Sequence, residues 1–186
     1  MKKRIIIISL IILVSDFIIV KILKNLEIWH LIEEKKSYWR IGSNIYHHDI
    51  LPNINVEESW GKYKYKLITN SLGFRDFNQN IVKKQSDKKR IALIGDSFIE
   101  GIGLSYEDSL SGKISNFLID DYEVLNMGVA SYSPTNYYYK LKHFLEKEYI
   151  FDSVFVFLDL SDIIDEIKYE YDKNNQLVLN FDNFKS

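Results

Sequence analysis

The sequence predicts an α/β domain whose parallel β-sheet is covered by helices on both faces, preceded by an N-terminal transmembrane helix. Two observations lead to this prediction. Short, largely apolar strand patterns at residues 91–94, 122–126 and 154–158 are separated by stretches with helical spacing of apolar residues. Such strands are typical of parallel sheets buried on both faces, which gives a three-layer α/β/α arrangement. In addition, a nearly unbroken apolar run occupies residues 5–23.

Composition excludes several classes of protein. Of the 186 residues, 46% are hydrophobic, and 24 basic side chains against 26 acidic ones leave a net charge of −2. A disordered chain and a nucleic-acid-binding protein are therefore not expected. The absence of cysteine excludes disulfides, thiolate zinc sites and cysteine nucleophiles, and the four histidines (30, 47, 48 and 143) show no metal-ligand spacing. We expect no metal ion and no cofactor.

Residues 1–26 are expected to form a membrane anchor. Lys2, Lys3 and Arg4 precede the apolar run, which at about 1.5 Å per residue reaches about 28 Å, close to the hydrocarbon core of about 30 Å. No small-residue cleavage site follows, which favours an uncleaved anchor over a signal peptide or a buried soluble helix. The positive charges predict a cytoplasmic N-terminus, with the remaining chain on the outer side of the cytoplasmic membrane.

Residues 27–88 are predicted to be a largely irregular linker region. A helix could continue over residues 27–36, whereas residues 37–60 show no clear period and stay unassigned. Alternation of apolar and polar side chains predicts a strand at residues 63–69, and turn-forming residues follow at 70–76. Residues 78–89 are expected to be an exposed connector.

Residues 89–186 are predicted to form the α/β domain. The strand at 91–94 ends at Gly95, and apolar residues at helical spacing predict a helix over 107–119. After the strand at 122–126, Ser133 and Pro134 form a suitable N-cap and first-turn pair for the next helix. The strand at 154–158 precedes a helix over 162–169. The crossovers between these parallel strands are expected to be right-handed.

Ligands of parallel sheets bind beyond the carboxyl ends of the strands, so the residues that follow each strand are the candidate site. Gly95-Asp96-Ser97, Asn126-Met127-Gly128 and 159–162 occupy these positions. The hydroxyl of Ser97 is placed to face the cleft, and the amides of Ser97 and Gly128 could hold a developing oxyanion. These are the groups that acyl transfer requires.

The motifs G-D-S-F-I-E-G, N-M-G and a strand running into S-D resemble the first three sequence blocks of the SGNH (GDSL-type) hydrolases. The resemblance covers residues 89–166. It implies a flavodoxin-like α/β/α fold and serine-dependent hydrolysis or transfer of acyl esters, with Ser97 as nucleophile and Gly128 as an oxyanion donor. It also implies that the residue before Asp162 donates to the oxyanion, and that residue is Ser161.

Two departures from the family pattern stand out. Ser161 occupies the position where the family has asparagine, so the donor would be a shorter hydroxyl. The D-x-x-H arrangement that supplies the general base does not occur in this chain, and a serine without a base is a poor nucleophile. Because the sequence stops soon after residues 177–179, we expect a truncated member with an incomplete sheet.

The expected function is an anchored SGNH-type hydrolase or acyltransferase that acts on ester bonds, with O-acyl groups of envelope glycans as a possible substrate class. The alternative is a catalytically inactive, truncated module that binds a glycan or a protein partner. Structural interpretations stay open for each site residue: Ser97 in an ordinary turn, Asp96 as a turn-stabilising acceptor, Gly128 in a tight connection, Ser161 as a helix N-cap, and His143 in packing. His47 and His48 are candidates for a substitute base.

Overall fold

The computed structural model describes residues 15, 21, 38–167, 169–172 and 176–179. The chain divides into two compact units, Met1–Tyr38 and Trp39–Ser186. Residues 39–88 thus belong to the same unit as the strands and helices that follow them. All elements discussed below lie in this second unit.

The expected N-terminal transmembrane helix is not supported, and the fold prediction is corrected on this point. Among the residues that the structure describes, no helix combines the length and the apolarity needed to cross a bilayer. The segment 1–26, on which the expectation rested, lies outside the described residues except for Ser15 and Lys21. What the structure supports is an α/β fold with a partly parallel sheet.

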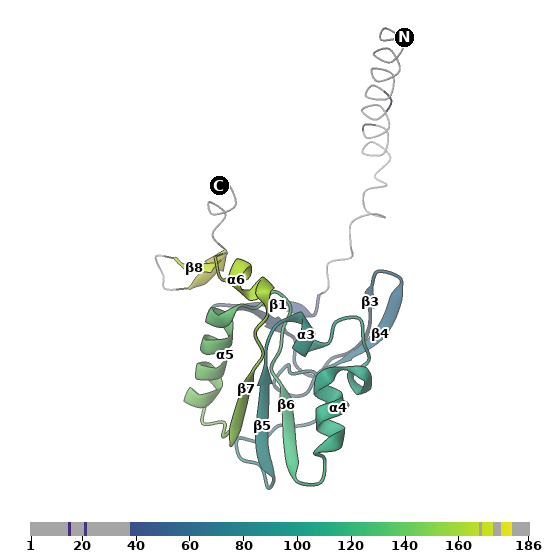
Figure 1. Ribbon diagram of the computed structural model, residues 1–186, viewed down its shortest axis with the longest axis vertical. Coiled ribbons are helices and arrows are strands. Elements are labelled where there is room, and N and C mark those ends of the chain that lie inside the picture. Colours follow the sequence, from purple (N-terminus) through teal and green to yellow (C-terminus); the bar gives the residue numbers. More distant parts are fainter. Residues whose placement is uncertain (1–14, 16–20, 22–37, 168, 173–175, 180–186) are drawn as a thin grey trace. The chain divides into compact units, whose positions relative to one another are not determined.

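A three-stranded parallel sheet with strand order β6-β5-β7 forms the centre of the second unit (Figure 1). Its strands are β5 (Lys89–Ile94), β6 (Tyr122–Asn126) and β7 (Ser153–Val156). Ile91 of β5 lies opposite Val124 of β6 and Ser153 of β7. All three strands run in the same direction, so their carboxyl ends meet at one edge of the sheet.

Helices α4 (Leu110–Phe117) and α5 (Pro134–Glu146) pack against opposite faces of this sheet. Ile94 of β5 shares a buried cluster with Phe144 of α5, whereas Leu93 packs in a second cluster with Ile114 of α4. The helix expected over 107–119 is split into a 3-10 turn, η1 (Tyr106–Asp108), and α4. The split occurs because the Ser109 hydroxyl caps α4 by accepting a hydrogen bond from the Gly112 amide at 3.1 Å.

The region left unassigned by the sequence contains three strands. β1 (Arg40–Ser43) pairs with β2 (His47–Ile50), and β3 (Asn55–Trp60) pairs with β4 (Tyr63–Ile68), both antiparallel. Ile50 and Leu67 are buried in the same cluster as Phe144 of α5. These hairpins therefore contribute to the core on the α5 side of the sheet.

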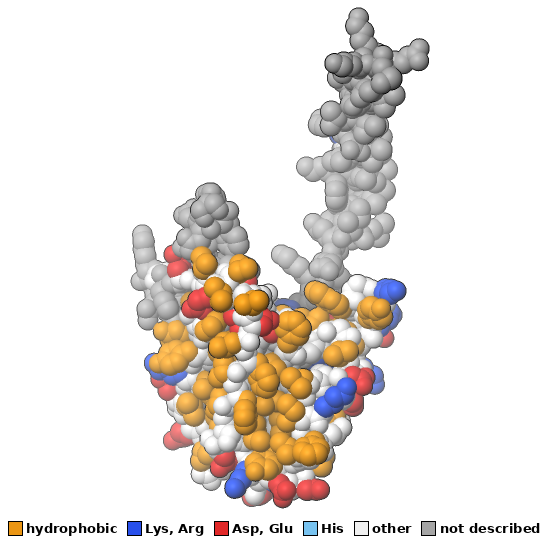
Figure 2. Space-filling model, in the orientation of Figure 1, with side chains coloured by type: hydrophobic (Ala, Val, Ile, Leu, Met, Phe, Trp, Pro, Cys, Tyr) orange, Lys and Arg blue, Asp and Glu red, His pale blue; other side chains and the backbone are white. Residues whose placement is uncertain are grey.

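The chain continues after β7 as α6 (Leu160–Glu166) and an antiparallel pair, β8 (Tyr169–Tyr171) and β9 (Leu177–Leu179). α6 begins earlier than predicted because the Asp159 carboxylate caps it, accepting from the Ser161 amide at 2.6 Å. The apolar pattern of β7 predicts burial, but all four residues of β7 are exposed. Hydrophobic side chains gather over the strands of this sheet on the face shown in Figure 2.

Candidate active site

The three segments that follow β5, β6 and β7 come together at the carboxyl edge of the sheet. The Val129 amide donates to the Gly95 carbonyl at 3.2 Å, which joins the segment after β6 to the end of β5. Carboxylate oxygens of Asp96, Asp159 and Asp162 lie within 4.8 Å of one another, which brings in the segment after β7. The sequence-predicted convergence of these segments is thus present in the structure.

Ser97 is the first residue of α3 (Ser97–Glu100), directly beyond the central strand. Asp96 caps this short helix, because its Oδ1 accepts from the Phe98 amide at 2.9 Å. Its other oxygen, Oδ2, accepts from the Ser97 hydroxyl at 3.4 Å. Ser97 is half-buried, and within the described residues its amide has no hydrogen-bond acceptor. Asp96 therefore acts as a cap with one oxygen and faces the serine with the other.

Gly128 is buried, and its amide is engaged inside the protein. The Gly128 N–H donates to the Asn126 side-chain oxygen at 3.0 Å. A Cβ at this position would lie 2.6 Å from the Glu100 nitrogen and 2.7 Å from the Ile99 Cβ. In this structure Gly128 therefore permits close packing of its loop on α3, and its amide is not directed at a substrate.

Ser131, in the loop after β6, has an unusual backbone conformation that the sequence does not predict. It is exposed, and its φ of 62° lies in the left-handed region, which non-glycine residues seldom adopt. Its carbonyl accepts from the Tyr169 hydroxyl at 2.6 Å, while its amide has no acceptor within the part of the chain that the structure describes. A serine in this loop carries no sequence signal for that conformation.

Ser161 lies in the first turn of α6, and its hydroxyl contacts Asp159, the residue that caps this helix. Its hydroxyl donates to Asp159 Oδ1 at 2.6 Å, and the side chain is exposed. This hydrogen bond lowers the pKa of Asp159. The interpretation of Ser161 as the N-cap, which the sequence left open, is therefore wrong: Asp159 is the N-cap of α6, and its carboxylate accepts from the amides of Ser161 and Asp162.

The three carboxylates give this edge a negative potential. Burial raises the pKa of Asp96, and the charges of Asp159 and Asp162 raise it further. Asp162 is almost fully buried and accepts from the Tyr137 hydroxyl at 2.9 Å and from the Asp159 amide at 3.0 Å. Three carboxylates at this spacing are the kind of group that could hold a hard divalent cation. Each of them already accepts hydrogen bonds from the protein.

Behind the site, Glu100 holds the loop that follows β6. Its fully buried carboxylate accepts from Arg40 of β1 at 2.8 and 2.5 Å, and from the Ala130 amide at 2.6 Å. A buried carboxylate is stable only when paired and hydrogen-bonded in this way. The position of residues 127–131 therefore depends on the ion pair between Arg40 of β1 and Glu100.

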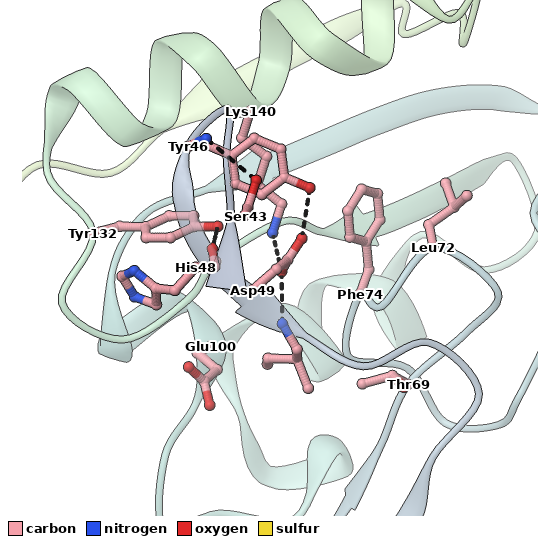
Figure 3. Close-up of polar contacts among 12 residues, drawn as sticks. Ser43, Tyr46, His48, Asp49, Thr69, Leu72, Phe74, Glu100, Tyr132 and Lys140 are labelled. Atoms are coloured by element: carbon pink, nitrogen blue, oxygen red, sulfur yellow. Dashed lines mark hydrogen bonds and ion pairs between the residues drawn. The ribbon is translucent and has the colours of Figure 1, made fainter. Parts of the chain in front are cut away.

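A second buried ion pair lies beneath this loop. Lys140 of α5 donates to Asp49 of β2 at 2.8 Å, and Asp49 also accepts from the Tyr46 hydroxyl at 3.0 Å (Figure 3). The Lys140 ammonium lies 5.1 Å from the ring centroids of Phe74 and Tyr132. Burial lowers the pKa of Lys140, while the Asp49 charge opposes that shift. The pair is enclosed by aromatic rings and joins α5 to the β1–β2 hairpin.

One of the two adjacent histidines, His48, contacts the loop that follows β6, and His47 contacts His48. His48 Nε2 lies 2.7 Å from the Ala130 carbonyl, and its Nδ1 lies 2.7 Å from His47 Nδ1. Because a carbonyl only accepts, Nε2 carries the proton. Burial lowers the pKa of His48 to about 4, so its Nδ1 accepts from His47. Among the described residues, neither histidine hydrogen-bonds to Ser97. His143 packs edge-on against Tyr46, with ring centroids 5.7 Å apart.

Neither the protein-family models nor the curated proteins contain a match to this chain.

Proposed function

We propose that this protein is a serine-dependent hydrolase of acyl esters, with Ser97 as the nucleophile. One arrangement carries the proposal: a half-buried hydroxyl at the end of the central strand, beside a carboxylate, with the amide of Ser97 without an acceptor among the described residues. A nucleophile, a proton acceptor and free main-chain donors are the components of acyl transfer. The resemblance of residues 95–101 to the SGNH hydrolases supports the same chemistry.

The reaction proceeds in two steps. The Ser97 hydroxyl gives its proton to Asp96 Oδ2 as its oxygen bonds to the ester carbonyl carbon. The carbonyl oxygen becomes an oxyanion, which the amide of Ser97 stabilises. The tetrahedral intermediate collapses, the alcohol leaves with the proton from Asp96, and an acyl-serine remains. Water then attacks the acyl carbon and loses a proton to Asp96. The bond between the acyl carbon and Ser97 breaks to release the acid, and the Ser97 oxygen takes that proton back from Asp96.

The charges around Ser97 favour neutral ester substrates. Asp96, Asp159 and Asp162 would repel a carboxylate or phosphate close to the reacting carbonyl. O-acyl groups of uncharged glycans satisfy this condition and belong to the substrate class that the family resemblance implies. An acyltransferase would use the same acyl-serine, with a hydroxyl of the acceptor in place of water.

Replacing the nucleophile tests the proposal directly. Ser97→Ala is expected to reduce hydrolysis of p-nitrophenyl acetate by the purified full chain to the uncatalysed background, because the acyl-serine cannot form. Ser161→Ala is the matched control and should retain most of the turnover, since among the described residues the hydroxyl of Ser161 donates to Asp159 and not to Ser97. Equal, background-level turnover by the wild type and Ser97→Ala would overturn the proposal and favour a non-catalytic binding module.

The pH dependence of the same reaction tests the base. Only the carboxylate form of Asp96 accepts a proton, and its pKa is raised. Turnover is therefore expected to rise as the pH passes the raised pKa of Asp96 and then to level off. Absorbance at the isosbestic wavelength of nitrophenol measures its release at each pH. Asp96→Asn retains the ability to cap α3 and should lose about 10²–10⁴-fold in rate, the usual contribution of a general base. An unchanged rate in Asp96→Asn would contradict this role.

A non-catalytic binding module is the second candidate function. One observation favours it: among the described residues, no histidine or lysine side chain is hydrogen-bonded to Ser97, and Asp96 lies at the long distance of 3.4 Å. A binding module would retain affinity for acylated glycans in both the wild type and Ser97→Ala, with no turnover in either.

A further inference from the structure

Arg75 is a buried arginine that the proposed reaction does not use. It lies in the segment that follows β4 and is 1% exposed. Its backbone forms isolated bridges with Thr69 and with Asn126, the last residue of β6. A guanidinium stays charged inside a protein, so it must be hydrogen-bonded there to offset its loss of water. The acceptors of Arg75 therefore indicate what this residue does.

The two terminal nitrogens of Arg75 donate to four backbone carbonyls. Nη1 donates to the carbonyls of Glu100 at 2.7 Å and Gly101 at 2.6 Å. Nη2 donates to the carbonyls of Leu104 at 2.7 Å and Lys66 at 3.2 Å. Three of these carbonyls belong to the last residue of α3 and the loop after it, and the fourth belongs to β4. Because a charged donor makes stronger hydrogen bonds than a neutral one, the guanidinium holds the C-terminal end of α3 against β4.

The C-terminal end of α3 is linked directly to Ser97 at its other end. α3 has only four residues, and a helix this short is unstable without tertiary contacts. At its end, Gly101 has a left-handed backbone with a φ of 78°. The amides of Gly101 and Ile102 both donate to the Ser97 carbonyl, at 2.9 and 3.2 Å. A shift of Gly101 is therefore passed on to Ser97.

We propose that Arg75 is a positioning residue for ester hydrolysis: its guanidinium fixes the C-terminal end of α3, and thereby the place of the Ser97 hydroxyl. The inference rests on the proposed function, because the place of this hydroxyl matters only if Ser97 is the nucleophile. Arg75 acts through the backbone of Gly101 and touches no reacting atom. Lysine cannot replace it, because one ammonium with three hydrogens cannot serve four carbonyls that the two nitrogens of a planar guanidinium reach.

Arg90 provides a matched control for Arg75. It is also 1% exposed. Its guanidinium donates to three backbone carbonyls and one carboxylate, those of Lys83, Lys84, Ile150 and Glu123. Arg90 lies near the amino end of β5, whereas Ser97 follows the carboxyl end of the same strand. Arg90→Lys therefore alters a buried arginine of the same kind without removing a contact of α3.

Steady-state hydrolysis of p-nitrophenyl acetate by the full chain separates positioning from stability. Arg75→Lys is expected to lower kcat by about 10²-fold, the cost of displacing a reacting group by about 1 Å. KM should stay unchanged, because contacts that hold the bound substrate are not removed. Thermal unfolding should show a loss of stability in both Arg75→Lys and Arg90→Lys, but Arg90→Lys should keep the kcat of the wild type. A kcat of Arg75→Lys no lower than that of Arg90→Lys would overturn the proposal.

Amide hydrogen exchange gives a second readout that needs no turnover. In the wild type, the amides of Glu100 and Gly101 should exchange as slowly as those of β5, because Arg75 prevents α3 from opening by itself. In Arg75→Lys, but not in Arg90→Lys, they should exchange at least about tenfold faster relative to β5, since charge-assisted hydrogen bonds are lost.

Fast exchange of these two amides in the wild type would overturn the proposal, and this measurement applies even if Arg75→Lys does not fold. Unchanged exchange relative to β5 in Arg75→Lys would overturn it as well. Wild-type turnover no higher than that of Ser97→Ala would instead refute the ester hydrolysis, while the exchange rates would still show whether Arg75 holds α3. The two failures are thus distinguishable.

Discussion

Replacing Lys140 with methionine is expected to lower the free energy of unfolding by about 3–5 kcal/mol, the usual cost of leaving one partner of a buried ion pair uncompensated. Methionine preserves most of the apolar stem that packs among Tyr46, Phe74 and Tyr132. What it removes is the ammonium that neutralises Asp49. Urea unfolding of the full chain, followed by far-ultraviolet circular dichroism, measures the loss.

Two further variants identify the cause of that loss. Asp49→Asn combined with Lys140→Met removes both charges and should recover much of the stability, since neutral replacements of a buried pair are often tolerated. Lys142→Met is the matched control on the same helix. Lys142 is 48% exposed, and its ammonium lies 3.8 Å from Glu146 in an exposed ion pair, so the free energy of unfolding should change by no more than about 0.5 kcal/mol. A double variant no more stable than Lys140→Met would show that the orphaned charge is not the cause.

Gly128→Ala should affect both stability and ester hydrolysis. The added Cβ would be 2.6 Å from the backbone nitrogen of Glu100, so the loop after β6 and α3 must move apart. Overpacking of this kind costs about 1–3 kcal/mol. The same movement displaces α3, the helix that begins at Ser97, and a displacement of about 1 Å can reduce turnover by about 10²-fold. Thermal unfolding and p-nitrophenyl acetate hydrolysis measure the two effects.

Gly42 provides the control for that substitution. It lies in β1, and a Cβ there would meet nothing within 4 Å. Gly42→Ala should therefore change neither the melting temperature nor the turnover by a measurable amount. If Gly128→Ala behaved like Gly42→Ala, the close packing of the loop on α3 would be refuted.

The sequence predicts the central elements well because their patterns are local. The apolar run at 91–94 gives β5 to within two residues, and Ser133 with Pro134 marks the start of α5. By contrast, β1 and β2 contain four residues each, alternate poorly, and are held by distant partners such as Glu100. Strand formation of that kind depends on tertiary context more than on intrinsic preference.

The candidate site is predictable in its location but not in its details. The positions of Asp96, Ser97 and residues 159–162 follow from the ends of the parallel strands. The direction in which a backbone amide points does not follow from strand ends. The sequence therefore predicts that the Gly128 amide donates to a substrate, whereas in the structure it donates to the Asn126 side chain. The left-handed backbone of Ser131 is set by its loop. The exposure of β7 is equally invisible, because an apolar strand reads the same whether or not another chain covers it.

The link from Arg40 to Glu100 to Ala130 has a consequence for the order of folding. The contact between Arg40 and Glu100 spans 60 residues, whereas residues paired between β5 and β6, such as Ile91 and Val124, are 33 positions apart. Loop-closure entropy favours the local strand pair first. The sheet can thus assemble before the residues around Ser97 acquire their geometry. During refolding, native secondary structure would therefore return before ester hydrolysis does. On mild denaturation, the residues around Ser97 would be the first to lose their arrangement.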